Sequence, residues 1–201
     1  MSTSSVESPR RRGRPRHAAA SKAIVEATLE LLAERGFQAA TMDEIAARAG
    51  VGKNTIYRRW TSKEELIVDA IRDLTSELDV QEDGEIFAQL LARIRDFMHV
   101  FADPVLGPLI PGLLGELQRN PVFASAYVEQ IVTPRYERII ALLREAIDRG
   151  ELAEGTDPEV VADLLIGPPL LRLLFPFGLP DLPERYPEEV LETIWRGIAP
   201  S

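Results

Sequence analysis

Residues 41–66 have the sequence TMDEIAARAGVGKNTIYRRWTSKEEL. Both ends of this stretch carry a helix-start signal, because Thr41-x-x-Glu44 and Ser62-x-x-Glu65 each have the pattern of a capping box. Between them, Gly50-Val51-Gly52 is typical of a tight turn, since glycine adopts the positive φ that a sharp turn requires. The stretch therefore predicts a short helix, a turn, a second short helix and the start of a further helix.

The second short helix is expected from Lys53 to Trp60, with Ile56 and Trp60 facing inward. A short helix, a glycine-containing turn and a second short helix form the helix-turn-helix motif, whose second helix enters the major groove of DNA. The residues expected to reach base edges or phosphates are Lys53, Asn54, Thr55, Tyr57, Arg58 and Arg59. Thr41 and Lys63 suit phosphate contacts, because free N–H groups at helix starts reinforce the attraction.

A longer helix is expected before this motif, from about Ser21 to Arg35. The apolar residues Ile24, Ala27 and Leu31 recur there at helical spacing, and Gly36 is placed to end the helix. A fourth helix is expected after Ser62. The sequence therefore predicts a three-helix unit with a linking helix behind it.

Residues 1–19 are rich in serine and arginine and are expected to form a disordered basic arm. Within the arm, Arg12-Gly13-Arg14-Pro15 resembles the core of an AT-hook. Extended arginines of that kind, here Arg12 and Arg14, enter a narrow minor groove, where the negative potential is concentrated. The alternative is a disordered tail that adds only nonspecific affinity for DNA.

The charge of the chain is unevenly distributed. The net charge is −9, but residues 1–63 carry 12 Lys and Arg against 6 Asp and Glu, whereas residues 64–201 carry 11 against 26. Because an acidic body repels a polyanion, a basic N-terminal third indicates that DNA contacts are confined to one end.

The remaining sequence is expected to form a second, all-helical domain. Gln81–Gly84 marks the boundary, so that residues 20–82 form the DNA-binding domain with its linking helix and residues 83–201 form the second domain. Apolar periodicity and proline or glycine breaks predict helices at 85–102, 105–118, 121–149, 158–175 and 187–198. The predicted fold class is therefore all-α.

Composition limits the other possibilities. The chain has no cysteine, which excludes disulfides and thiol nucleophiles. No run approaches about 18 consecutive apolar residues, so no membrane contact is expected and a cytoplasmic location is the default. His99 is the only histidine outside the arm, and no metal-ligand cluster or nucleophile–base pair accompanies it. We expect no cofactor, no metal site and no enzymatic activity.

Three segments of the sequence together resemble the DNA-binding signature of TetR-family regulators. They are Thr41–Ala46, Ala49–Trp60 and Ser62–Leu66, and the preceding Arg35-Gly36-Phe37 matches as well. The resemblance covers about residues 20–70. It implies an all-α homodimer that binds a palindromic operator in double-stranded DNA and releases it when a small-molecule effector enters the C-terminal domain.

Carried onto this chain, the resemblance implies phosphate contacts by Thr41, Tyr57 and Lys63 and a recognition segment from Gly52 to Thr55. It places the effector cavity among the middle helices, with an apolar or amphipathic ligand. The expected lining residues are Phe97, Met98, Phe101, Leu113, Leu117, Phe123, Tyr127 and Ile131. It also implies dimerisation through the last two helices, the alternative being that their apolar residues pack within the monomer.

Two other functions are compatible with parts of the sequence. A ligand-independent architectural DNA-binding protein would account for the basic arm, but it would leave the large acidic helical domain unexplained. An α-helical enzyme with an incidental helix-turn-helix would need a catalytic constellation, and none is evident. The favoured interpretation is a ligand-responsive transcriptional regulator, most simply a repressor.

Overall fold

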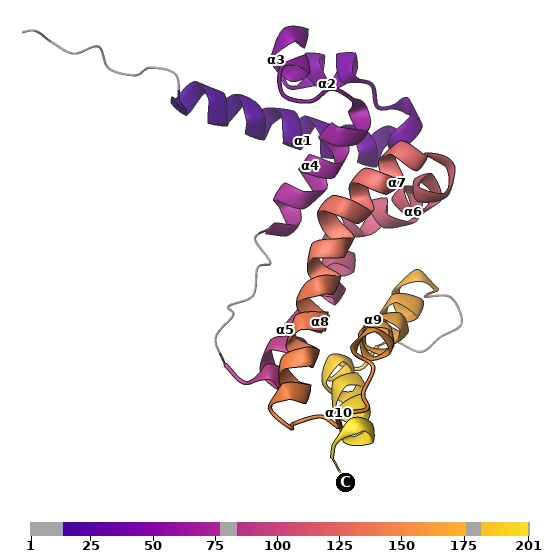
Figure 1. Cartoon of the computed structure of the whole chain (residues 1–201). Coiled ribbons are helices and arrows are strands. Elements are labelled where there is room, and N and C mark those ends of the chain that lie inside the picture. Colours follow the sequence, from indigo (N-terminus) through magenta and orange to yellow (C-terminus); the bar gives the residue numbers. More distant parts are fainter. Residues whose placement is uncertain (1–13, 77–83, 176–181, 201) are drawn as a thin grey trace, which may run out of the picture. The chain divides into compact units, whose positions relative to one another are not determined.

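The computed structural model describes residues 14–76, 84–175 and 182–200. Within these ranges every regular element is a helix, which confirms the all-α class (Figure 1). The first helices along the chain are α1 (Arg14–Ala39), α2 (Met42–Arg48), α3 (Lys53–Tyr57) and α4 (Lys63–Ser76). The later helices are α5 (Ile86–Ala102), α6 (Ile110–Arg119), α7 (Pro121–Tyr127), α8 (Thr133–Asp148), α9 (Pro158–Leu174) and α10 (Tyr186–Ile198). A 3-10 turn, η1 (Gly107–Leu109), precedes α6, and a π-helical segment, η2 (Val128–Val132), precedes α8.

The helices form two compact units, Met1–Ile67 (unit 1) and Val68–Ser201 (unit 2). The division falls inside α4, so the later part of this helix belongs to unit 2. The domain boundary expected at residues 81–84 lies mostly outside the described residues.

The first helix of unit 1 is longer than expected. α1 begins at Arg14 rather than near Ser21, so residues 14–16 are helical and not part of an extended arm. Pro15 is compatible with this helix start, because the first N–H groups of a helix have no intrahelical acceptor. Arg10, Arg11 and Arg12 lie outside the described residues.

Gly36 ends the regular part of α1, as the sequence predicts. Its φ of 74° lies in the left-handed region, where a side chain would be strained, and the chain turns there toward α2. The core of unit 1 consists of the predicted inward positions: Ile24, Leu31, Ile45, Ile56, Trp60 and Leu66 are each at most 2% exposed. Burying each such side chain contributes about 1.5–3 kcal/mol.

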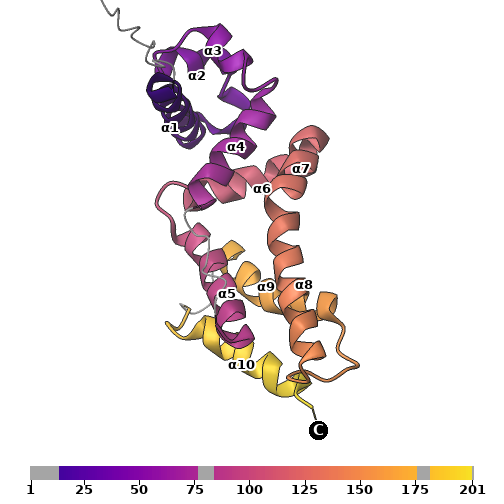
Figure 2. The same ribbon diagram turned by 60° about the vertical axis from the view of Figure 1, so that its left-hand side comes forward.

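The core of unit 2 lies between α5, α8, α9 and α10, which Figures 1 and 2 show as neighbours. Leu90 and Ile94 of α5 meet Leu143 of α8, Leu165 of α9 and Leu191 of α10 in one apolar cluster. These residues come from helices that are far apart in sequence. The cluster therefore fixes how the C-terminal helices pack against one another.

The helix expected over residues 121–149 is interrupted by the π-helical segment η2. Pro134, in the first turn of α8, provides the physical reason. Proline has no N–H to donate to the carbonyl of Gln130, so the regular α-helical ladder cannot pass through this point. The interruption divides the expected helix into α7 and α8.

The helix predicted at 158–175 is present as α9, and it continues through Gly167-Pro168-Pro169. The carbonyls of Leu164 and Leu165 have no N–H donor four residues later, because proline lacks an N–H, yet the flanking turns remain helical.

In the described part of the chain, no single helix is long and apolar enough to cross a membrane. One bent pair of segments, Ile86–Ala102 and Gly107–Arg119, has the length and composition of a membrane span, with an angle of 75° between the two segments.

Candidate DNA-binding and effector sites

The first helix of the helix-turn-helix is held at its start by Thr41. The backbone N–H of Glu44 donates to Thr41 Oγ1 at 3.2 Å, and the Thr41 hydroxyl donates to Glu44 Oε2 at 2.9 Å. The same carboxylate accepts from Arg35 Nη1 at 2.7 Å. The predicted cap is therefore present, and an ion pair ties it to α1.

The turn between α2 and α3 orients the second helix. Gly50 adopts a φ of 65°, and the N–H of Val51 donates to the carbonyl of Ala46 at 3.0 Å. Ile56, on the inner side of α3, is fully buried, and Trp60 just beyond the helix is 2% exposed. Anchoring by these two side chains turns the opposite side of α3 to the surface.

The outer side of α3 carries most of the residues predicted to contact DNA. Lys53, Asn54, Tyr57 and Arg58 are exposed, as are Gly52 and Thr41, while Thr55 is half-buried. Tyr57 is 50% exposed although it is a large aromatic residue. An exposed phenol beside cationic and amide side chains suits contact with phosphates and base edges.

Lys53 is engaged within the protein. Its Nζ lies 2.6 Å from Oδ2 of Asp43 on α2, and this hydrogen bond raises the pKa of the lysine. Both side chains are more than half exposed, so the pair is accessible to solvent. A contact between Lys53 and DNA requires the ammonium group to exchange this carboxylate for a DNA acceptor.

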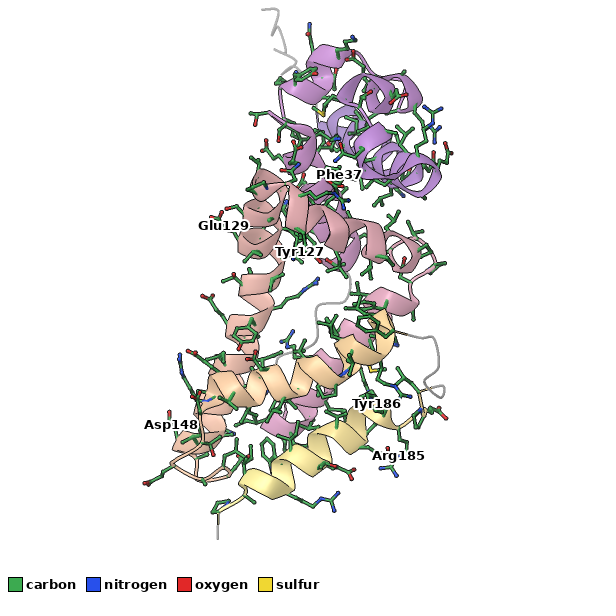
Figure 3. The ribbon with its side chains drawn as sticks, turned by 90° about the vertical axis from the view of Figure 1, so that its right-hand side faces the viewer. Phe37, Tyr127, Glu129, Asp148, Arg185 and Tyr186 are labelled. Atoms are coloured by element: carbon green, nitrogen blue, oxygen red, sulfur yellow. The ribbon has the colours of Figure 1, made fainter. Side chains whose placement is uncertain are left out.

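Two other cationic residues that were predicted to contact DNA, Lys63 and Arg59, instead make contacts with α1. Lys63 Nζ donates to the carbonyl of Phe37 at 2.8 Å and lies 4.6 Å from the centre of the Phe37 ring, a residue labelled in Figure 3. Arg59 donates to Ser21 Oγ and lies over the Trp60 ring. These contacts could not be predicted from the sequence, because Phe37 and Ser21 belong to α1 and meet the two cations only through the packing of unit 1.

Unit 2 contains a cavity of about 180 Å³. On α5, Arg93, Asp96, Phe97 and Val100 face it at helical spacing. The other lining residues come from α4, from the α7–α8 segment and from α9: Thr75, Tyr127, Ile131, Val132, Arg135, Tyr136, Ile139 and Ile166. Apolar walls with a few polar groups give this cavity the chemical character of a small-molecule site.

Three of the eight predicted lining residues, Phe97, Tyr127 and Ile131, line this cavity. Met98 instead packs against the apolar cluster of unit 2, because it shares the core-facing side of α5 with Ile94. The remaining four do not line the cavity: Phe101, Leu113, Leu117 and Phe123. Phe101 packs edge-on against Phe97, and Phe123 is fully buried beneath Tyr127, so both support lining residues without reaching the cavity.

Two tyrosines bring hydroxyl groups to the cavity wall. Burial raises the pKa of Tyr127, and the positive charge of Arg135 partly offsets this effect. Tyr136 donates to Asp163 at 2.9 Å, and that carboxylate raises the pKa of the phenol. Figure 3 labels Tyr127 in unit 2 and shows Glu129, two residues later, at the outer surface.

A helix-turn-helix with an exposed second helix, together with a helical unit that encloses a cavity, defines the chain as a DNA-binding protein of the one-component regulator class. Family comparison gives the same result for both parts. Residues 24–70 match the model for bacterial regulatory proteins of the tetR family, and residues 80–194 match the Tetracyclin repressor-like C-terminal domain. The chain belongs to the TetR family of DNA-binding transcriptional regulators.

Individual relatives support this assignment. The chain is 33% identical to the uncharacterized HTH-type transcriptional regulator YdeS of Bacillus subtilis (strain 168), over 94% of each chain. It is 28% identical to the DNA-binding transcriptional repressor TetR of Mycobacteroides abscessus, covering 72% of this chain and 76% of the relative. Among solved structures, the Flavonoid-responsive Regulator FrrA superposes with a TM-score of 0.70 at 27% identity, over 91% of this chain and 98% of that chain.

Proposed function

We propose that the protein is a homodimeric repressor that binds a palindromic operator and is released by a small amphipathic effector. The observation that carries the proposal is the exposed outer side of α3, where Lys53, Asn54, Tyr57 and Arg58 surround a helix anchored by Ile56. Two such helices, one from each subunit, would enter successive major grooves. The proposed site of action is the bacterial cytoplasm, where the operator lies.

The dimer assignment is supported by an apolar stripe on α9. Val160, Leu164 and Leu171 are between 48% and 55% exposed, and their spacing of four and seven residues puts them on one side of the helix; Phe175, directly after the helix, is 59% exposed. An exposed apolar stripe of this length is characteristic of a protein–protein interface. We assign it, with the adjoining α10, to the interface with a second copy of the chain.

The effector assignment is supported by the cavity of unit 2. Thr75, which lines the cavity, lies on the same helix as Lys63, the first residue of α4. An effector that prefers one arrangement of α4 would change the spacing between the two recognition helices and lower the affinity for the operator. The relative FrrA is described as flavonoid-responsive, and the relative from M. abscessus is described as a repressor.

The test is footprinting of the purified protein on the DNA upstream of its own gene, at two salt concentrations. We expect a protected palindrome with two half-sites separated by one helical turn of DNA. Tyr57→Ala should lower the affinity about tenfold or more without lowering the thermal midpoint, because Tyr57 is exposed and anchors nothing in the core.

Diffuse protection that follows A·T content and is unaffected by Tyr57→Ala would contradict the proposal. That result would favour a ligand-independent architectural DNA-binding protein. In that case the basic arm that precedes α1, including Arg12, would be the principal contact. Arg12 lies outside the described residues, so the role of the arm stays a prediction.

A further inference from the structure

The charges at the cavity wall are opposite in sign to those of the surrounding sequence. Residues 64–201 carry 26 Asp and Glu against 11 Arg, yet the cavity is lined by two arginines, Arg93 and Arg135, and by one carboxylate, Asp96. The other lining residues are apolar except Thr75 and two tyrosines. A largely apolar wall with an excess of one positive charge is suited to a small organic anion and not to a neutral hydrocarbon.

Arg93 has an unused donor at this wall. Its Nε atom is buried, and no atom of the described residues accepts a hydrogen bond from it. Buried polar groups in proteins nearly always have a partner, so a buried donor without a protein acceptor needs another acceptor, which a water or a bound molecule can supply. Guanidinium groups bind carboxylates through two parallel hydrogen bonds, which makes a carboxylate a well-matched acceptor.

We propose that the cavity binds a small monocarboxylate with an aromatic or short aliphatic body, and that Arg93 holds the carboxylate. This inference rests on the proposed effector function and specifies its chemistry. The body of the ligand lies against Phe97, Ile131 and Ile139, and Arg135 adds positive charge from α8. A cavity of about 150 Å³ accommodates benzene, so about 180 Å³ accommodates a ring or short chain with one carboxylate.

The experiment is calorimetric titration of the full-length protein with matched pairs of probes. Each pair is a carboxylate and its neutral amide: 3-phenylpropanoate with 3-phenylpropanamide, and hexanoate with hexanamide. The two members of a pair have almost the same shape, so the ratio of their affinities isolates the charge. We expect the carboxylate of at least one pair to bind about tenfold more tightly than its amide.

Arg93→Met replaces the aliphatic stem of the side chain and removes the guanidinium group, with its charge and its Nε donor. In this variant the preference for the carboxylate should disappear. The thermal midpoint of the unliganded variant should stay the same or rise, because a buried unpaired donor has been removed. Arg144→Met is the matched control, since Arg144 is exposed on α8 and does not line the cavity, and it should keep the preference.

Arg93→Lys provides a second test in case the methionine variant is poorly folded. It retains one positive charge but loses the planar pair of donors, so the preference for the carboxylate should become smaller without disappearing. A preference that is unchanged in both Arg93 variants would overturn the proposal. So would equal binding of acid and amide in each pair, or binding of neither member.

The outcomes separate this inference from the proposed function. If acid and amide bind equally and both release the operator, the cavity is an effector site but its charge selectivity is wrong. If the upstream palindrome is not protected in the footprinting experiment, the proposed function fails, whatever the titrations show. A carboxylate preference that depends on Arg93 would still establish the cavity as an anion site in that case.

Discussion

The two units of the protein build their candidate sites in opposite ways. In unit 1 most of the residues predicted to contact DNA are neighbours in sequence, between Gly52 and Arg58, and they lie on or beside one short helix. In unit 2 the cavity is enclosed by residues as distant as Thr75 and Ile166. A site carried by one helix depends mainly on local sequence, whereas a cavity depends on how distant helices pack.

The units also differ in how their cations are paired. Lys53 and Lys63 of unit 1 already have partners inside the protein, namely Asp43 and the carbonyl of Phe37. Arg93 of unit 2 has a buried Nε without an acceptor among the described residues. Under the functions proposed above, DNA binding exchanges the partners of these lysines, whereas ligand binding gives Arg93 Nε a partner.

The largest expected effects test whether the two units are stable independently. Ile56→Ala removes a fully buried side chain of unit 1, and Leu143→Ala removes one of unit 2. Each should lower the free energy of unfolding of its own unit by about 2–5 kcal/mol, because the truncation leaves a cavity in a packed core. The measurement is hydrogen exchange at increasing urea concentrations, because it reports the unfolding of each unit separately.

The comparison between the units predicts different functional consequences for these two variants. Ile56→Ala should abolish operator binding and leave the titration with 3-phenylpropanoate unchanged. Leu143→Ala should weaken ligand binding, because the apolar cluster of unit 2 packs against Tyr136, which lines the cavity. Simultaneous unfolding of both units in either variant would show that they form one cooperative body.

Much of unit 1 could be predicted from its sequence for a physical reason. Capping at Thr41, the positive φ of Gly50 and the burial of Ile56 are determined within a few residues of each position. Helix lengths were less predictable. The start of α1 at Arg14 is not signalled by apolar periodicity, because residues 14–20 contain no apolar residue larger than alanine or proline.

The cavity could be predicted only in part. Phe97, Tyr127 and Ile131 were found because apolar residues in the middle helices were expected to line it. Arg93 and Asp96 were missed, although they share one side of α5 with Phe97 and Val100. The recurrence of Arg93 and Asp96 at helical spacing with Phe97 and Val100 is a pattern that could have identified them. However, only the packing of α5 against α8 and α9 shows which side of α5 faces the cavity and which faces the core.

A smaller effect is expected where a DNA-facing cation is held by a carboxylate. Asp43→Asn removes the ion pair to Lys53 and also a negative charge from the DNA-facing surface. Operator affinity should rise, by up to about tenfold at low salt, because Lys53 no longer has to leave a carboxylate before it meets the DNA. The measurement is a binding titration on the operator at several salt concentrations.

The matched control is a double-mutant cycle with Lys53→Met. If the gain operates through Lys53, Asp43→Asn should have much less effect in the Lys53→Met background. A gain of the same size in both backgrounds would show that Asp43 acts only by general repulsion of the DNA. The internal pairing of Lys53 would then have no role in operator affinity.

The smallest effect is expected for the ion pair between α1 and α2. Arg48 donates to both carboxylate oxygens of Glu34, at 2.6 and 2.7 Å, and these hydrogen bonds lower the pKa of Glu34 below its ordinary value. A carboxyl group whose pKa is lower in the folded state stabilises the fold fully above its unfolded pKa and loses that contribution as the pH falls through the folded pKa. Glu34→Gln should therefore slightly lower the urea midpoint of unit 1 at pH 7, and the difference from the unmodified protein should vanish at acidic pH.

Glu26→Gln is the control. The partner of Glu26 is Lys22, which lies on the same helix at a distance of 3.7 Å, so loss of that pair leaves the contact between α1 and α2 intact. A difference that persists at acidic pH would mean that Glu34 contributes through packing on α1 and not through its charge.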